Sequence, residues 1–196
     1  FNKKNITMAI QSRGFLRGKG GSRADQIDSA FNHASDHFFD VANTQHNNST
    51  DAANVGTIII PRNTLRVGSV IKVTSAGTCV STNSSDTLTP VLNLIHGDSS
   101  PTTVALLTGA ALNVSNNDIV SCESTILITS IGTTGTFTAT SKFNTDAAGV
   151  VTKAGIVAST TVDTTTEIFI HLNVDWSVAN ASNQYTHLLH TAQIYG

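Results

Sequence analysis

Apolar and polar positions alternate along residues 167–176. Because successive side chains of a β-strand point to opposite faces, this pattern predicts a half-buried strand with one continuous apolar face. That face consists of Ile168, Ile170, Leu172, Val174 and Trp176. The small polar residues at 177–183 predict a turn. A final strand is expected over 184–195.

The same alternation recurs upstream at short, regular intervals. We expect about eight strands and almost no helix, which indicates an all-β fold of the β-sandwich or jelly-roll type. The further strands are expected at 57–60, 69–75, 88–95, 102–107, 118–131, 136–143 and 150–159. The core should contain Ile71, Val73, Leu92, Leu94, Ile126, Ile128, Phe137, Ile170, Leu172, Val174 and Trp176.

Glycines mark two local features of this pattern. Ala76-Gly77 predicts a bulge or bend, beyond which the strand starting at 69 continues over 78–81. Gly132-Thr133-Thr134-Gly135 separates two alternating segments and predicts a β-hairpin.

The first 54 residues do not share the regular strand pattern. Apolar residues at three-to-four spacing favour a short helix over 25–38, whereas Phe38-Phe39-Asp40-Val41 could equally begin a strand. Residues 43–54 are polar and are expected to form a loop. We therefore expect an arm and linker at 1–54 and the β-domain at 55–196.

Positive charge is concentrated at the start of the chain. Six of the eleven Lys and Arg residues and none of the thirteen Asp and Glu residues lie in residues 1–24; this segment carries +6, and the remainder, with five basic and thirteen acidic residues, carries −8. A basic, glycine-rich segment with sparse apolar residues is typical of an interaction arm. The residues expected to bind a partner are Lys3, Lys4, Arg13, Phe15, Leu16, Arg17, Lys19 and Arg23.

A neighbouring protein subunit is the favoured partner of this arm. The alternatives are the chain's own domain or its trimer mates, and nucleic acid. Nucleic acid is disfavoured because the segment has few aromatic residues for stacking and no recognisable binding motif.

The sequence contains no nucleophile elbow, zinc-protease helix, P-loop or dinucleotide fingerprint. We therefore expect a non-enzymatic protein with no cofactor and with no catalytic or metal-binding residues. Charged residues make up 12% of the chain, about half the usual quarter. No run of about 18 apolar residues is present, so no transmembrane helix is expected, and no secretory signal is visible.

Several histidines could suggest chemistry, but each has a simpler interpretation. His33 and His37 lack a third ligand at recognisable spacing and fit a solvated helical face. His187 and His190, three residues apart on a strand, are expected on opposite faces. His171 is expected to be an ordinary surface histidine.

The remaining candidate residues also have structural interpretations. Cys79 and Cys122 have no metal-like spacing and are expected to be buried free thiols rather than a disulfide. His96-Gly97-Asp98 is expected to be a turn. Trp176 lies on an apolar face, where it should anchor the core; a sugar-stacking platform would need the ring exposed.

Four segments, in order, resemble a jelly-roll structural domain of tailed-bacteriophage virion proteins. They are residues 59–71 (Ile-Ile-Pro-Arg-Asn-Thr-Leu-Arg-Val-Gly-Ser-Val-Ile), 87–94 (Thr-Leu-Thr-Pro-Val-Leu-Asn-Leu), 132–135 and 174–183 (Val-Asp-Trp-Ser-Val-Ala-Asn-Ala-Ser-Asn). Ser69 stands where that family usually has an acidic residue.

The resemblance spans residues 55–196 and implies a jelly-roll domain that forms a homotrimer. It also implies a place on the outer surface of the virion, as a head decoration (cement) protein, head fibre or tail-fibre component. The implied partners are the major capsid protein or other virion subunits, with no membrane. An alternative is a receptor- or glycan-binding module of a fibre, which exposed aromatic residues at one loop end would favour.

Overall fold

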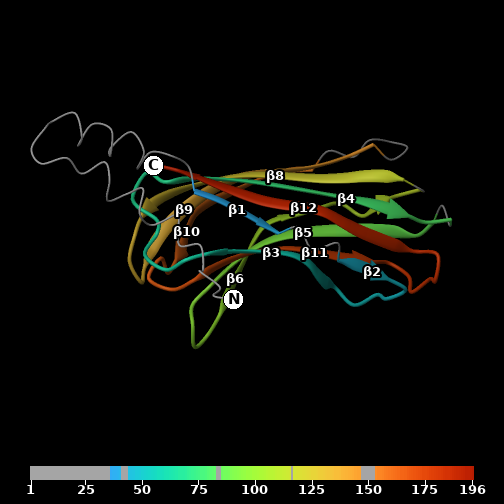
Figure 1. Ribbon diagram of the computed structural model, residues 1–196, viewed down its shortest axis with the longest axis horizontal. Coiled ribbons are helices and arrows are strands. Elements are labelled where there is room, and N and C mark those ends of the chain that lie inside the picture. Colours follow the sequence, from blue (N-terminus) through green and yellow to red (C-terminus); the bar gives the residue numbers. More distant parts are fainter. Residues whose placement is uncertain (1–35, 41–43, 83–84, 116, 147–152) are drawn as a thin grey trace, which may run out of the picture. The chain divides into compact units, whose positions relative to one another are not determined.

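The structure is a computed structural model that describes residues 36–40, 44–82, 85–115, 117–146 and 153–196. Throughout these residues, alternating apolar and polar side chains produce strands. These residues form twelve strands (Figure 1). The strands are β1 (Asp36–Asp40), β2 (Gln45–Asn47), β3 (Ala53–Ile60), β4 (Val70–Val80), β5 (Thr87–His96), β6 (Thr102–Thr108), β7 (Leu112–Asn113), β8 (Asp118–Ser130), β9 (Gly135–Thr145), β10 (Lys153–Val162), β11 (Ile168–Trp176) and β12 (Gln184–Tyr195).

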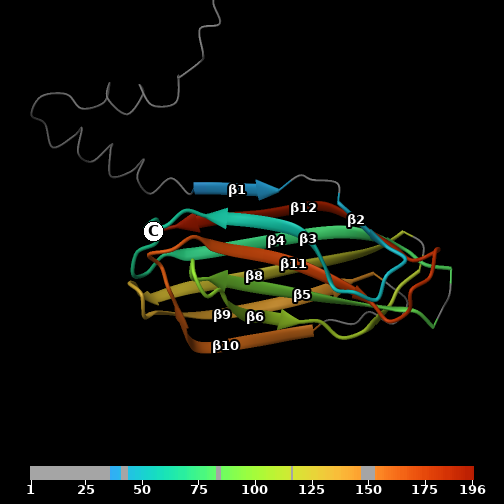
Figure 2. The ribbon, with the colours of Figure 1, turned by 90° about the horizontal axis from the view of Figure 1, so that it is seen from below.

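The strands assemble into two sheets that lie face to face (Figure 2). Sheet A has the order β1-β12-β4-β8-β9-β10, with β2 also paired to β12; sheet B has the order β3-β11-β5-β6, with β7 also paired to β5. Neighbouring strands run antiparallel, as in the β8–β9 hairpin expected at residues 132–135. The predicted all-β sandwich is confirmed.

Strand β11 lies between β3 and β5 and contributes its whole apolar face to the space between the sheets. The opposing face of sheet A comes mainly from β4, β8 and β9. All eleven residues expected in the core are buried there: Ile71, Val73, Leu92, Leu94, Ile126, Ile128, Phe137, Ile170, Leu172, Val174 and Trp176. Burying a side chain of this size contributes about 1.5–3 kcal/mol, so these strands hold the sandwich together.

The sandwich begins earlier in the chain than residue 55. Strand β1 pairs with β12 over its five residues, and Phe38 packs against the core. The helix expected over 25–38 is therefore wrong at residues 36–38, where two-residue alternation prevails; residues 25–35 lie outside the described residues.

The expected loop at 43–54 also needs correction. It contains β2, which pairs with β12, and the first two residues of β3. Because β2 is three residues long and polar, it shows no apolar alternation that could reveal it. The domain boundary expected at residue 55 thus moves back to Asp36 for the described part of the chain.

Strand β4 runs past Ala76 and Gly77 without interruption, since its register with β8 advances one residue at a time from Val70 to Cys79. The bulge or bend predicted at Ala76 and Gly77 does not interrupt this pairing. A Cβ added to Gly77 would lie 2.2 Å from the hydroxyl oxygen of Tyr185. The backbone oxygen of Thr186 would lie 2.7 Å from the same Cβ. This glycine therefore marks a close approach by another strand, which is one of the usual reasons for glycine inside a strand.

Candidate functional site

The residues expected to bind a partner through the arm lie outside the described residues, as does His33. They are Lys3, Lys4, Arg13, Phe15, Leu16, Arg17, Lys19 and Arg23. His37 is exposed on β1, where its Nε2 lies 3.1 Å from Nε2 of Gln193. Within the described ranges, no group of three or more His, Cys, Asp or Glu side chains is arranged to hold a metal ion.

A serine–histidine pair lies in the interior of the sandwich. Ser75 on β4 hydrogen-bonds His190 Nδ1, and His190 Nε2 lies 3.0 Å from the carbonyl oxygen of Ile170 on β11. With Nε2–H donating to that carbonyl, Nδ1 accepts a hydrogen bond from the Ser75 hydroxyl, and the imidazole is neutral. Burial lowers the pKa of His190 to about 4. Both side chains have 0% exposure, so the pair links the two sheets and cannot present a nucleophile to a substrate.

His187 points into the same region, contrary to the expectation that His187 and His190 face opposite sides. Their ring centroids are 6.1 Å apart and both residues are fully buried. The strict alternation of β12 is interrupted between them, where Leu188 and Leu189 are both exposed. Gly56 makes room for the ring, because a Cβ added there would lie 2.9 Å from His187 Cε1.

Neither ring nitrogen of His187 makes a hydrogen bond of normal geometry to a described residue. Burial lowers its pKa, and the carboxylate and backbone of Asp40 oppose that effect only in part. Protonating His187 would place a charge in the interior of the sandwich, between β12, β1 and β3.

The turn that follows β11 is held by a buried polar network. The carboxylate oxygen Oδ2 of Asp86 accepts hydrogen bonds from Nδ2 of Asn180 at 3.1 Å and from Nδ2 of Asn183 at 3.0 Å. Asn183 Nδ2 also donates to the Val178 carbonyl at 3.1 Å, and Asn183 Oδ1 accepts from Ser81 at 2.9 Å. Asp86 and Asn183 are almost completely buried. Asp86 and Asn183 thus hold this turn in place, and sequence pattern alone did not reveal that both are interior.

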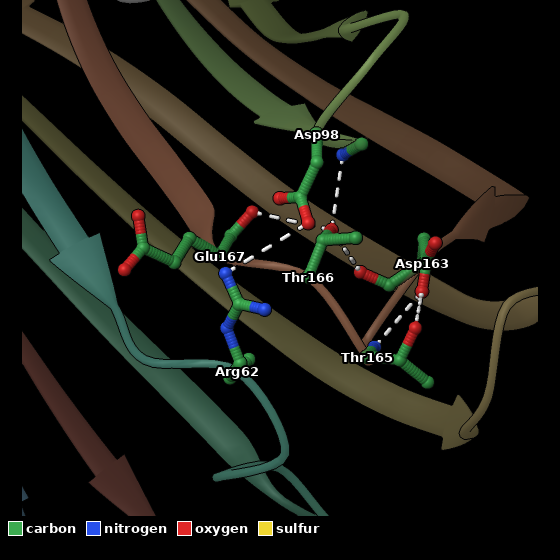
Figure 3. A network of polar contacts seen from close by, with 7 residues as sticks. Arg62, Asp98, Asp163, Thr165, Thr166 and Glu167 are labelled. Carbon is green, nitrogen blue, oxygen red and sulfur yellow. Dashed lines mark hydrogen bonds and ion pairs between the residues drawn. The ribbon is translucent and has the colours of Figure 1, made fainter.

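A second polar network lies at the other end of β11 (Figure 3). The backbone N–H and the hydroxyl of Thr165 donate to Asp163 Oδ1 at 2.9 and 2.6 Å, and the Thr165 hydroxyl bond is the main reason why the pKa of Asp163 is lowered. The Gly97 N–H donates to Thr166 Oγ1 at 3.0 Å. Arg62 Nη2 and Asp98 Oδ2 are 3.8 Å apart and more than half exposed. These contacts fasten the turn before β11 to the turn after β5.

The turn expected at 96–98 is present. Gly97 has φ of +94°, a conformation that glycine adopts readily. His96 points inward, and its Nδ1 accepts a 3.2 Å hydrogen bond from the backbone N–H of Asp163.

The outer face of sheet B is almost uncharged. Its five strands contain one carboxylate, Asp175, and no Lys, Arg or Glu. On this face Phe169 pairs with Ile59 and Ile95 in the neighbouring strands. His171, expected to be an ordinary surface histidine, lies half-buried on this outer face, and its ring contacts that of Phe169 edge-on, with 6.0 Å between centroids. The centre of a protein–protein interface typically has this composition, because it is partly apolar and contains few charged residues.

The outer face of sheet A carries a shallow groove of about 600 Å³ over β8, β9 and β10. Lys142 Nζ and Glu123 Oε2 form a 3.1 Å ion pair within it. The other outward side chains that line it are those of Thr125, Thr140, Ala154 and Ile156.

Trp176 cannot serve as a sugar-stacking platform. The ring is 1% exposed, and its Nε1–H donates to the carbonyl oxygen of His46 at 3.4 Å. It anchors the core, as its position on the apolar face of β11 predicts.

No protein-family model and no curated protein matches this chain. In the part of the chain that the structure covers, no helix combines the length and apolar character needed to cross a membrane.

Proposed function

We propose that this chain is a non-enzymatic structural protein of a virion, specifically a capsid decoration or cement protein on the outer surface of a tailed-phage head. Its sandwich would be a jelly roll that assembles as a homotrimer. The observation that carries the proposal is the near absence of charge from sheet B. A face of this composition suits burial against other protein subunits, and the resemblance of residues 55–196 to phage virion domains supplies the biological setting.

The basic arm supplies the attachment to the capsid in this proposal. Six positive charges in residues 1–24 oppose a net charge of −8 in the remainder of the chain, so the arm suits an acidic surface on a partner. One exposed ion pair contributes only about 0–1 kcal/mol. Three arms on one trimer act together, however, because binding of the first raises the effective concentration of the other two. Phe15 and Leu16 would add apolar contacts.

The test uses particles of the virus that encodes this chain, stripped of the protein. Purified full-length chain should co-sediment with them, and binding should weaken as NaCl is raised. The test variant replaces six residues with Gln: Lys3, Lys4, Arg13, Arg17, Lys19 and Arg23. It should fail to bind, and the oligomeric state of the unbound protein should stay the same. Arg66→Gln with Lys72→Gln, which removes positive charge from the sandwich, should bind like the wild type. Equal binding by the arm variant would reject the proposed attachment.

A receptor- or glycan-binding module of a fibre is the second candidate. The groove over β8–β10 favours it, because the hydroxyls of Thr125 and Thr140 and the Lys142–Glu123 pair could hydrogen-bond a sugar. The described lining residues include no aromatic ring for stacking. A specific glycan-array signal that Thr140→Val abolishes, together with a dispensable arm, would favour this candidate.

A further inference from the structure

Strand β10 forms one edge of sheet A, and apart from an irregularity between Val157 and Thr160 it has few of the features that protect such edges. Among the described strands it pairs only with β9, and Figure 2 shows it at the rim of the sandwich. Lys153 is its only charged residue, it contains no proline, and Ile156 is 81% exposed. Two of the other three edges are better protected, since β1 ends with Asp40 and β6 directly follows Pro101, and the remaining edge, β3, contacts β1 and β2.

The inner face of β10 is already occupied. A Cβ added to Gly155 would lie 2.7 Å from Cδ1 of Leu107 on β6, and Val157 packs against the core. The strand is therefore firmly seated on sheet B through this segment. Its register with β9 is regular from Lys153 to Val157 and shifts only between Val157 and Thr160. Among the described residues, none pairs with the outer edge of the β10 backbone, and of its outward side chains Ile156 is the most exposed apolar one.

We propose that β10 pairs antiparallel with β10 of a second copy of this chain, across a two-fold axis. A two-fold interface uses the same surface on both subunits, so one contact removes the unpaired edges of both copies together. In an antiparallel pair centred on Ile156, Lys153 of one copy lies opposite Ser159 of the other. Like charges are thus kept apart, and the two Ile156 side chains lie on the same face, near the axis.

Charge favours a second copy over a charged segment of another protein. The groove beside Ile156 contains Lys142 and Glu123, which neutralise each other at 3.1 Å. Its other outward residues carry no charge. The segment that best fits this edge is itself extended and carries little charge, and residues 153–159 of β10, the stretch that faces its own copy in this register, contain one charged residue in seven.

This pairing goes beyond the proposed function, because it would join copies whether or not they also form trimers. The test is the mass of the full-length protein by light scattering, set against 20.5 kDa for one chain. Wild type should have an even number of chains, and Ile156→Lys should halve that number: dimer to monomer, or hexamer to trimer if sheet B also makes a three-fold contact. Phe39→Lys, at a 70% exposed residue on the opposite edge strand of the same sheet, should leave the mass unchanged.

A second measurement distinguishes loss of the pairing from misfolding of the variant. Amide hydrogen exchange in β10 should be slow in wild type and should accelerate at least tenfold in Ile156→Lys, with exchange in β8 unaltered. Ile156→Thr, which is β-branched and neutral, should keep the wild-type mass. Equal masses for wild type and Ile156→Lys, including a trimer in both, would overturn the pairing and leave the proposed function standing. Protection of β10 that arises only on adding virus particles would assign the edge to another virion protein and also overturn it.

Discussion

The hydroxyl group of Tyr185 occupies the space in front of Gly77, where a side chain would otherwise stand. An added Cβ would lie 2.2 Å from the hydroxyl oxygen and 2.7 Å from the backbone oxygen of Thr186. Tyr185 is fully buried, and burial raises the pKa of its hydroxyl. The two residues therefore fix how closely β12 packs beside β4.

Gly77→Ala should destabilise the protein by about 1–3 kcal/mol, the usual cost of forcing extra atoms into a packed interior. The free energy of urea unfolding measures this cost. Ala76→Val adds two methyl groups at the adjacent, outward-facing position and should change it by less than about 0.5 kcal/mol. Equal effects of the two substitutions would show that Tyr185 does not limit the space at Gly77.

Asn183→Ala should be among the most destabilising single substitutions in the chain. It removes one donor from the buried Asp86 carboxylate and one acceptor from the Ser81 hydroxyl. Losing a buried hydrogen bond in this way costs about 1–3 kcal/mol, and more when one partner is charged. Val178→Ala, in the same turn but half-exposed, should cost under about 1 kcal/mol by thermal or urea unfolding. A small effect of Asn183→Ala would mean that water replaces the amide.

The alternation of apolar residues predicted the long strands because half-buried sheets impose a period of two on them. It therefore located β11 and β12 and the inward position of Trp176. The pattern failed where a strand is short and polar, as in β2, and where strict alternation breaks, as between His187 and His190. Both failures involve residues whose orientation depends on pairing with a distant strand.

Buried polar groups were the least predictable part of the candidate site. An asparagine in a run of Ser, Ala and Asn has the composition of a turn, and Asn183 does end one. Its burial follows from the contact with Asp86, almost a hundred residues earlier. Local sequence contains no signal for such a contact. The groove and the open edge of β10 likewise depend on strand order, which alternation does not specify.

The two cysteines should be unreactive in the folded protein. Cys79 and Cys122 are free and buried, and burial raises the pKa of both thiols, that of Cys122 to about 12. Because the thiolate is the reactive form, Ellman's reagent at pH 8 should detect no thiol in native protein and two after denaturation in urea without a reductant. One or two fast-reacting thiols in native protein would contradict their burial. None after denaturation would indicate a disulfide.

Acid should destabilise the sandwich through its interior histidines. Burial lowers the pKa of His190 to about 4, and it lowers the pKa of His187, His46 and His96 as well. The unfolded chain binds protons near the ordinary histidine pKa of about 6.5, so it takes up more protons than the folded state between that pH and the folded pKa. Stability is therefore complete above about pH 6.5 and falls as the pH drops towards 4.

His190 alone should account for a loss on the order of 3 kcal/mol across this window, given 1.36 kcal/mol for each pH unit. Urea unfolding at intervals from pH 7.5 to 4.5 measures the slope. His190→Asn should be less stable than wild type at pH 7.5, because the links to Ser75 and Ile170 are disturbed. Its stability should nevertheless fall less steeply, so that the two curves converge as the pH drops. Parallel curves would show that His190 is not the group that titrates.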